Sequence, residues 1–317
     1  MAVDAPLPLE PSSAQAPAAK LRRAQWLSVL GHAIRTPRGT VGLALTSVIV
    51  LICAIGPAVA PYNPNALLGA PYTKPSGTYL LGLDYLGRDV LSRTLDGGWE
   101  LLVMALAATV FGLVVGGAAG ISAAYLKGKA DGLIMRTVDV ILAFPQLVFA
   151  LLLVSILGPK LWLIVLAVGF SHAPAVSRVL RSATLDVSER DFVKSVELQG
   201  MRPSTVMRKE ILPNLISPIM VEAGLRLTYS IVIMAGLSYL TFGPPPPQAN
   251  WGTDIGLNQL GISPYANPLA VVIPALLIAL LTIGTNTFTD AIARVAIGVD
   301  RKPEEAVLLD NIGTQPA

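Results

Sequence analysis

A polar loop of this sequence reads Arg181-Ser-Ala-Thr-Leu-Asp-Val-Ser-Glu-Arg-Asp-Phe-Val-Lys-Ser-Val-Glu-Leu-Gln-Gly-Met-Arg-Pro203 and runs on to Ile211-Leu-Pro-Asn214. It lies between two apolar segments that are each long enough to cross a bilayer. Such a loop is the largest charged stretch in a mostly apolar chain. We therefore expect it to fold and to contact a soluble partner.

The composition is that of an integral membrane protein. The 317 residues are 53% hydrophobic and 14% charged, with a mean hydropathy of +0.63, whereas soluble domains carry about 25% charged residues. One cysteine and two histidines (Cys53, His32 and His172) make a disulfide framework or a Cys/His metal site within the chain unexpected. Basic residues flank the apolar segments instead of forming a stripe with aromatic residues, so we expect no nucleic-acid partner.

The apolar segments predict an all-α polytopic membrane protein with six transmembrane helices. A bilayer core of about 30 Å requires about 20 apolar helical residues. Six segments qualify: Val41–Ala60, Glu100–Tyr125, Leu133–Leu157, Leu161–Leu180, Ile216–Thr241 and Leu269–Ala291. The apolar runs are continuous and do not alternate, which favours helices over a β-barrel.

These spans divide the chain into five parts. They are an N-terminal tail (1–38), a first transmembrane helix (39–61), an outer loop (62–98), a five-helix domain (99–293) with a polar loop at about 181–215, and a C-terminal tail (294–317). The first residues, to about position 20, are rich in Pro and Ala and resemble a disordered tail. Ala58-Val-Ala60 resembles a signal cleavage site, but the apolar run before it is long enough to span and Pro61 follows directly, so we expect a retained anchor.

The distribution of basic residues predicts the orientation. Those assigned to one side are Lys20, Arg22, Arg23, Arg35, Arg38, Lys127, Lys129, Arg136, Arg178, Arg181, Arg190, Lys194, Arg202, Arg208, Lys209, Arg294, Arg301 and Lys302. The opposite side has only Lys74, Arg88, Arg93 and Lys160. By the positive-inside rule, both termini and the polar loop are cytoplasmic, in a multi-pass protein of the cell membrane.

A face of small residues runs along the second span. Gly112, Gly116 and Gly120 follow one another at four-residue steps, which lets another helix approach closely. The partner is either another helix of this chain or a second subunit.

The polar loop predicts two short helices. Ser188 with Asp191 three residues later resembles an N-terminal cap. Phe192, Val193 and Val196 then share one helical face.

Further along the loop, Gly200 suits the left-handed position after a helix, Pro203 can open a second helix and Pro213 can end it. The resulting apolar stripe either docks on a cytoplasmic partner or lies on the lipid headgroups.

Four motifs in order give a resemblance to a known family. They are Phe192-Val-Lys-Ser-Val-Glu-Leu-Gln-Gly200 followed, after ten intervening residues, by Ile211-Leu-Pro-Asn214; Leu81-Gly-Leu-Asp-Tyr-Leu-Gly-Arg-Asp-Val-Leu-Ser-Arg93; Asp131-Gly-Leu-Ile-Met-Arg-Thr-Val-Asp-Val-Ile-Leu-Ala-Phe-Pro145; and Pro246-Pro247 with Trp251-Gly252. Together they resemble binding-protein-dependent ABC importer permeases of the dipeptide and oligopeptide branch, over about residues 30–300. The first motif is similar to the EAA loop of that family, although Ser195-Val196 stands where the family has Ala-Ala. The loop after the fifth span departs from the family pattern at Thr241 and Gln248-Ala-Asn250.

The resemblance implies the transmembrane domain of a type I ABC importer, in which the loop inserts into a groove of a cytoplasmic ATPase. The residues expected to couple to the ATPase are Asp191, Phe192, Val193, Ser195, Val196, Gly200, Leu212, Pro213 and Asn214. Of these, Phe192, Val193 and Val196 are expected to be buried in the docking groove. The last three are expected to anchor the loop to the fifth span.

The sequence lacks a nucleotide-binding or catalytic motif. No Gly-x-x-x-x-Gly-Lys-[Ser/Thr] occurs, because Gly128-Lys129 lacks the upstream glycine. We find no Gly-x-Ser-x-Gly, no His-Glu-x-x-His and no convincing acidic pair. We therefore expect a transport subunit without enzymatic activity or cofactor, with ATP and magnesium bound by partner subunits.

Charged residues inside the spans are functional candidates by default. Glu222 and Arg226, four residues apart, either line a path for charged peptides or form a structural pair near the inner leaflet. We expect Asp139 to pair with Arg136, and His172 to be a polar residue near the cytoplasmic end of the fourth span.

The outer segment from Pro61 to Gly98 is too long for a simple turn. Asp89 and Arg93 lie four apart on an expected short amphipathic helix. The resemblance implies that Asp84, Arg88, Asp89 and Arg93 lie where a substrate-binding protein docks. The alternative is a lid that covers the helix ends.

The resemblance thus implies one half of a heterodimeric pore, formed with a homologous permease, two ABC ATPase subunits and an extracytoplasmic substrate-binding protein. Di- or oligopeptides are the expected cargo, and nickel, glutathione or short sugars are carried by related systems. The rival class is a secondary transporter, which predicts inverted repeats and ionisable residues at mid-membrane. A membrane-embedded enzyme would need a catalytic constellation, which the sequence lacks.

Overall fold

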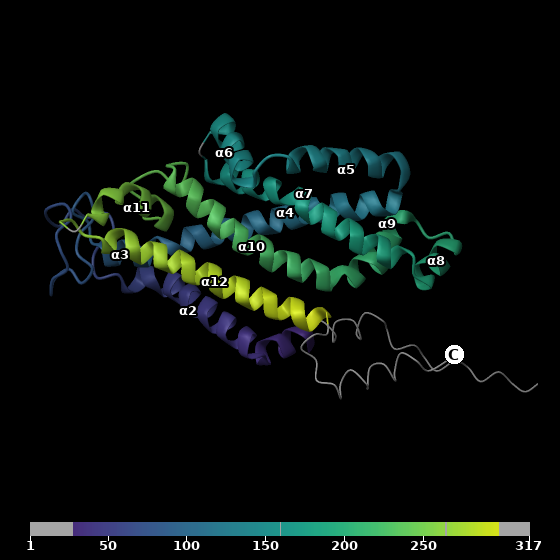
Figure 1. Ribbon diagram of the computed structural model, residues 1–317, viewed down its shortest axis with the longest axis horizontal. Helices are drawn as coiled ribbons and strands as arrows, with labels where there is room; N and C mark the ends of the chain where they lie inside the picture. Colours follow the sequence, from purple (N-terminus) through teal and green to yellow (C-terminus); the bar gives the residue numbers. More distant parts are fainter. Residues whose placement is uncertain (1–27, 159, 264, 298–317) are drawn as a thin grey trace, which may run out of the picture.

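The computed structural model describes residues 28–158, 160–263 and 265–297, and within these ranges the protein is helical, without a β-strand (Figure 1). Five long helices run side by side: α2 (Pro37–Val59), α4 (Gly98–Leu126), α7 (Leu161–Ser188), α10 (Ile216–Tyr239) and α12 (Leu269–Ile297). One end of the bundle carries α3 (Val90–Asp96), α11 (Trp251–Leu257) and the turn Gln259–Ile262, and the other end carries α8 (Asp191–Leu198) and α9 (Pro203–Val206). The expected all-α class is confirmed.

Among the described residues, five helical stretches are long and apolar enough to cross a membrane. The sixth predicted span is not one straight helix, because α5 (Gly128–Leu142) and α6 (Gln146–Leu157) meet at an angle of 91°. Pro145 explains the break: it has no N–H for the helical ladder, and its ring disfavours helical geometry at Phe144. Six crossings therefore hold only if the bent pair is one span.

The glycine face of α4 packs against α7 in the same chain. A Cβ atom at Gly112 would lie 2.7 Å from the Gly169 carbonyl oxygen, and Cβ atoms at Gly116 and Gly120 would likewise meet the α7 backbone. The Ser177 hydroxyl donates to the Gly116 carbonyl at 2.9 Å. Of the two interpretations left open by the sequence, internal packing is therefore correct for this face.

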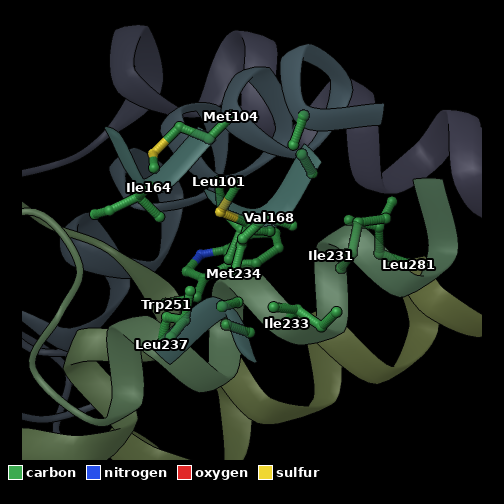
Figure 2. Packing of buried hydrophobic residues seen from close by; sticks show 14 of the residues in the cluster. Leu101, Met104, Ile164, Val168, Ile231, Ile233, Met234, Leu237, Trp251 and Leu281 are labelled. Carbon is green, nitrogen blue, oxygen red and sulfur yellow. The ribbon is translucent and has the colours of Figure 1, made fainter. Parts of the chain in front are cut away.

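The main core lies where α2, α4, α6, α7 and α10 meet α11 (Figure 2). Trp251, the first residue of α11, is fully buried among Leu101, Met234 and Leu237. Its indole N–H donates to the Thr94 carbonyl of α3 at 2.7 Å, so the polar end of the ring is satisfied. Helices α3 and α11 are thus fixed to the bundle through Trp251.

Part of each predicted tail is helical. Residues 28–35 form a helix whose Val29 and Ala33 pack against Ala291, Ile292 and Val295 of α12. Pro37 opens α2, and the Thr36 hydroxyl caps it by accepting from the Gly39 amide at 3.0 Å. The remaining tail predictions, residues 1–27 and 298–317, lie outside the described residues.

Candidate functional site

The polar loop between α7 and α10 projects from one end of the bundle (Figure 1). Helix α8 ends in a Schellman motif: the Gly200 amide donates to the Glu197 carbonyl at 2.9 Å, and the Met201 amide donates to the Val196 carbonyl at 3.4 Å. Gly200 has φ +78°, the left-handed conformation predicted for it. Pro203 opens α9, also as predicted.

The start and end of the predicted loop helices differ from the structure. Ser188 is the last residue of α7, its hydroxyl donates to the Leu185 carbonyl at 2.9 Å, and Arg190 is the N-cap of α8. Pro213 does not end the helical segment. A π turn (Met207–Ile211) and a 3₁₀ turn (Leu212–Leu215) follow α9 and lead directly into α10, because a proline is tolerated in the first turn of a new helical segment.

The apolar face of α8 points into the chain's own bundle. Val193 is 0% exposed and packs in a cluster with Val187, Val206, Ile211 and Leu215. Phe192 and Val196 are partly buried against the same cluster. The expectation that this stripe is presented to the cytoplasm is wrong for Val193, because the stripe holds the loop onto α7 and α10.

The exposed tip of the loop consists of other residues. Leu198 is 89% exposed and Met201 is 41% exposed, on either side of Gly200. Neither residue was predicted from the sequence pattern, because both fall outside the helical stripe that contains Val193. An apolar residue directly beside the turn glycine was the signal that could have revealed them.

Three predicted anchor residues join the loop to α10. Leu212 is exposed, and Pro213 and Asn214 are half-buried. The Asn214 side-chain amide donates to the Glu210 carbonyl at 2.5 Å. Asp191 and Ser195 are exposed on α8. The loop therefore has a buried base, a capped turn and an exposed apolar tip.

At the opposite end of the bundle, the four charged residues of the outer segment are buried. Asp84, Arg88, Asp89 and Arg93 are each at most 2% exposed. Arg88 pairs with Asp84 at 2.7 Å, and Asp89 caps α3 by accepting from the Ser92 amide at 2.8 Å. These side chains cannot themselves meet a docking partner in this conformation, and they build the lid that was the alternative interpretation.

Arg93 joins segments that are far apart in sequence. Its Nε donates to Asp254 Oδ1 of α11 at 3.0 Å, and its Nε also lies 3.6 Å from Asp84 Oδ2. Its Nη1 donates to the Pro64 and Pro247 carbonyls, each at 3.2 Å. The expected short helix at this position is confirmed, but Asp89 caps it while Arg93 reaches across to α11.

Asp254 is the acidic centre of this network. It is buried, and burial raises the pKa of its carboxyl to about 6, although the Arg93 guanidinium opposes the rise. Asn258, one turn later, accepts from the Tyr85 amide at 2.9 Å and thereby fixes the outer segment a second time. Asp254 was not among the predicted site residues, because its partner Arg93 lies 161 residues away in the sequence.

A chain of polar side chains crosses the middle of the bundle. His172 is fully buried, its Nε2 lies 2.8 Å from the Ser230 hydroxyl of α10, and its Nδ1 contacts Gln146 at the start of α6. Ser230 also contacts the Thr109 hydroxyl of α4 at 3.0 Å. The prediction of an interfacial His172 is therefore wrong, since this histidine lies midway along α7 and joins four helices.

The ionic pairs of the spans differ in part from those expected. Arg226 donates to Glu222 at 2.9 Å, as the i, i+4 spacing predicted, and its guanidinium lies 5.4 Å from the Tyr229 ring centroid. Asp139 pairs with Arg178 of α7 at 2.6 Å instead of with Arg136. The packing of α5 against α7 determines the partner of Asp139, and the spacing of residues in the sequence does not show this packing.

The described residues include no group of three or more His, Cys, Asp or Glu side chains that could hold a metal ion. The described residues thus form a structured loop at one end of the bundle and an ion-paired lid at the other. A chain of polar side chains joins four helices in the middle.

Comparison with known proteins identifies this architecture. Residues 108–296 match the family described as "Binding-protein-dependent transport system inner membrane component". This chain belongs to that family. It is a permease component of a membrane transport system, and the family name implies an ATPase and a substrate-binding protein as general partners.

Relatives of the permease carry peptide-related names. It is 36% identical over 224 residues to the di/tripeptide transport system permease protein DppC of Pseudomonas aeruginosa, covering 68% of this chain and 74% of that protein. It is 34% identical over 218 residues to the glutathione transport system permease protein GsiD of Pectobacterium atrosepticum, covering 69% and 72%. A solved structure of the MetNI methionine ABC transporter, inward facing, is similar at a TM-score of 0.49 and 16% identity over 64% of this chain and 96% of that one.

Proposed function

We propose that this permease forms half of a translocation pore with a homologous permease and moves di- or oligopeptides inward by alternating access. Two partner ATPase subunits bind ATP and magnesium, and their closure moves the loop between α7 and α10. The names of its relatives, a di/tripeptide and a glutathione permease, support this class of cargo. Nickel and short sugars are the alternatives within the same family.

The observation that carries the coupling proposal is the construction of the loop. A lever transmits motion only if it is stiff and fixed to what it moves. The buried cluster around Val193 fixes the base, the motif at Gly200 stiffens the turn, and Leu198 with Met201 remains available to a partner. We propose that this exposed tip, with Asp191 and Ser195 beside it, contacts the ATPase, while Val193 acts from within the permease.

The orientation follows from the same proposal. If the ATPase grips the loop, the loop and the termini are cytoplasmic, as the basic residues of the sequence predict. The lid of the outer segment then faces the substrate-binding protein. Large apolar side chains exposed at that end, Leu67, Leu80, Leu260 and Tyr265, are better candidates for the docking surface than the four buried charges.

Glu222 and Arg226 are proposed here as a structural pair. Both side chains are turned inward, with 5% and 11% exposed. Each neutralises the other, which reduces the cost of two charges inside a span.

Uptake of a labelled dipeptide by cells that carry the full transporter tests the proposal. Leu198→Asp is expected to abolish ATP-driven uptake and to release the ATPase during purification. Leu126→Asp, the same change at an exposed leucine of α4 at the same end of the bundle, is the control and should retain both. Uptake that persists without any ATPase would indicate a secondary transporter instead.

A further inference from the structure

A cavity of about 490 Å³ opens between α2, α10 and α12, near the end of the bundle that carries α8. The apolar side chains of its lining include Val221 and Leu225 of α10 and Ala293 of α12. Its polar side chains include Asn286 and Thr287 of α12. The function proposed above uses none of these residues.

Two guanidinium groups converge on a single carboxylate oxygen at the rim of this cavity. Arg38 Nη1 lies 3.6 Å from Asp290 Oδ2, and Arg294 Nε donates to the same oxygen at 3.1 Å. One negative charge is therefore shared by two positive charges. Each guanidinium has five N–H donors, so the pair can accommodate a second anion.

The rim is also accessible and lies at the level of the helix ends. The side chains of Arg38, Arg294 and Asp290 are between 40% and 57% exposed. Arg38 is in the first turn of α2, directly after the helix of residues 28–35, and Arg294 is in the last turn of α12. In a protein that spans a bilayer, this is the depth of the lipid headgroups.

We propose that this cavity binds an anionic phospholipid. The headgroup phosphate would lie between Arg38 and Arg294 and accept hydrogen bonds from the polar side chains of the lining. The part of an acyl chain nearest the headgroup would lie along Val221 and Leu225. The excess positive charge selects an anionic headgroup. The apolar side chains of the lining favour a lipid over free phosphate, because only a lipid has an acyl chain to place against them. Basic pockets between transmembrane helices are a known setting for such headgroups.

The test measures lipid binding to the intact transporter. The full-length permease, purified with its partner subunits in detergent, is titrated with phosphatidylglycerol or with phosphatidylcholine of the same acyl chains, and bound lipid is counted by native mass spectrometry. Phosphatidylglycerol is expected to bind more tightly. Arg38→Gln should weaken its binding about fivefold, the effect of about one basic residue near an anionic lipid.

Two matched variants make the result specific. Arg35→Gln removes the same charge one turn away, outside the lining of the cavity, and should leave binding unchanged. Ala293→Phe fills the apolar part of the cavity, keeps the charges and should weaken binding of phosphatidylglycerol. Unchanged melting temperatures of the variants would show that the fold is retained.

Four outcomes would overturn the proposal. They are equal loss in Arg35→Gln and Arg38→Gln, equal affinity for the two lipids, displacement of the lipid by millimolar inorganic phosphate, and a cross-link from Asn286→Cys to the partner permease in place of bound lipid. The third would identify a free-anion site, and the fourth would make the cavity a subunit interface. None of them bears on whether the transporter moves peptides, so the lipid site and the proposed function fail separately.

Discussion

The two ends of the bundle use charged residues in opposite ways. The loop at α8 keeps charges such as Lys194 outside and buries Val193, as an amphipathic helix does. The outer segment buries Asp84, Arg88 and Arg93 and exposes apolar side chains such as Leu80. The same residue types therefore form a projecting loop at one end and an ion-paired lid at the other. The buried charges of the lid are those that pair with an opposite charge of the same chain.

The largest effect is expected from breaking the lid. Arg93→Gln leaves Asp254 and Asp84 without their shared guanidinium, and removing one partner of a buried pair costs about 3–5 kcal/mol of unfolding free energy. Denaturation of the purified permease in mixed micelles measures it. Arg178→Gln breaks an exposed pair with Asp139 and should cost less than about 1 kcal/mol. Equal costs for the two variants would mean that the outer network does not hold the lid.

The lid should also make stability depend on pH. The pKa of Asp254 is about 6 in the folded protein against a reference value of 3.8, so the folded state holds the proton more tightly. The contribution of Asp254 to the unfolding free energy should therefore be greatest below about pH 4, fall by about 3 kcal/mol as the pH rises to about 6, and level off above it. Asp254→Asn should remove this part of the slope. A slope unchanged in that variant would assign the pH dependence to other groups.

A smaller effect is expected from Val193, at the buried base of the loop between α7 and α10. Val193→Ala removes two buried methyl groups and should cost about 2 kcal/mol. Leu198→Ala, at the exposed tip, should change stability by less than about 0.5 kcal/mol. The same denaturation experiment compares them. A larger cost at Leu198 would mean that the tip packs on the permease and is not free for a partner.

The smallest effect is expected from the polar chain that crosses the middle of the bundle through His172. Ser230→Ala removes contacts with His172 and Thr109 and should cost about 1 kcal/mol, a typical value for hydrogen bonds within membranes. Ser155→Ala, at an exposed position of α6, is the control and should cost nothing measurable. No difference between the two serines would show that the chain through His172 does not stabilise the bundle.

Local patterns in the sequence predicted the local structure well. Runs of apolar residues predicted six spans, of which five are continuous helices in the described residues. Single residues such as Gly200 and Pro203 predicted the turn and the second loop helix. These features depend on neighbours in the chain, which a sequence displays directly. Pro145 is the exception. The third span was predicted as one helix, although a proline in a helix interior favours the break that the structure has there.

The prediction of the candidate site failed where partners are distant. Arg93 meets Asp254 after 161 residues, and Asp139 chooses Arg178 over Arg136 because α7 packs beside α5. The direction of the Val193 face was wrong for the same reason, since α9 and α10 return to cover it. Periodicity identifies an apolar face, but only the fold determines what covers it.

The central claim is that the exposed tip of the loop, and not the buried stripe, is gripped by the ATPase. Single cysteines at Leu198, Met201 and Val193 in the assembled transporter, followed by thiol cross-linking to the ATPase, test it directly. Cross-links from Leu198→Cys and Met201→Cys, with none from Val193→Cys, are predicted. A cross-link from Val193→Cys without one from Leu198→Cys would contradict the account.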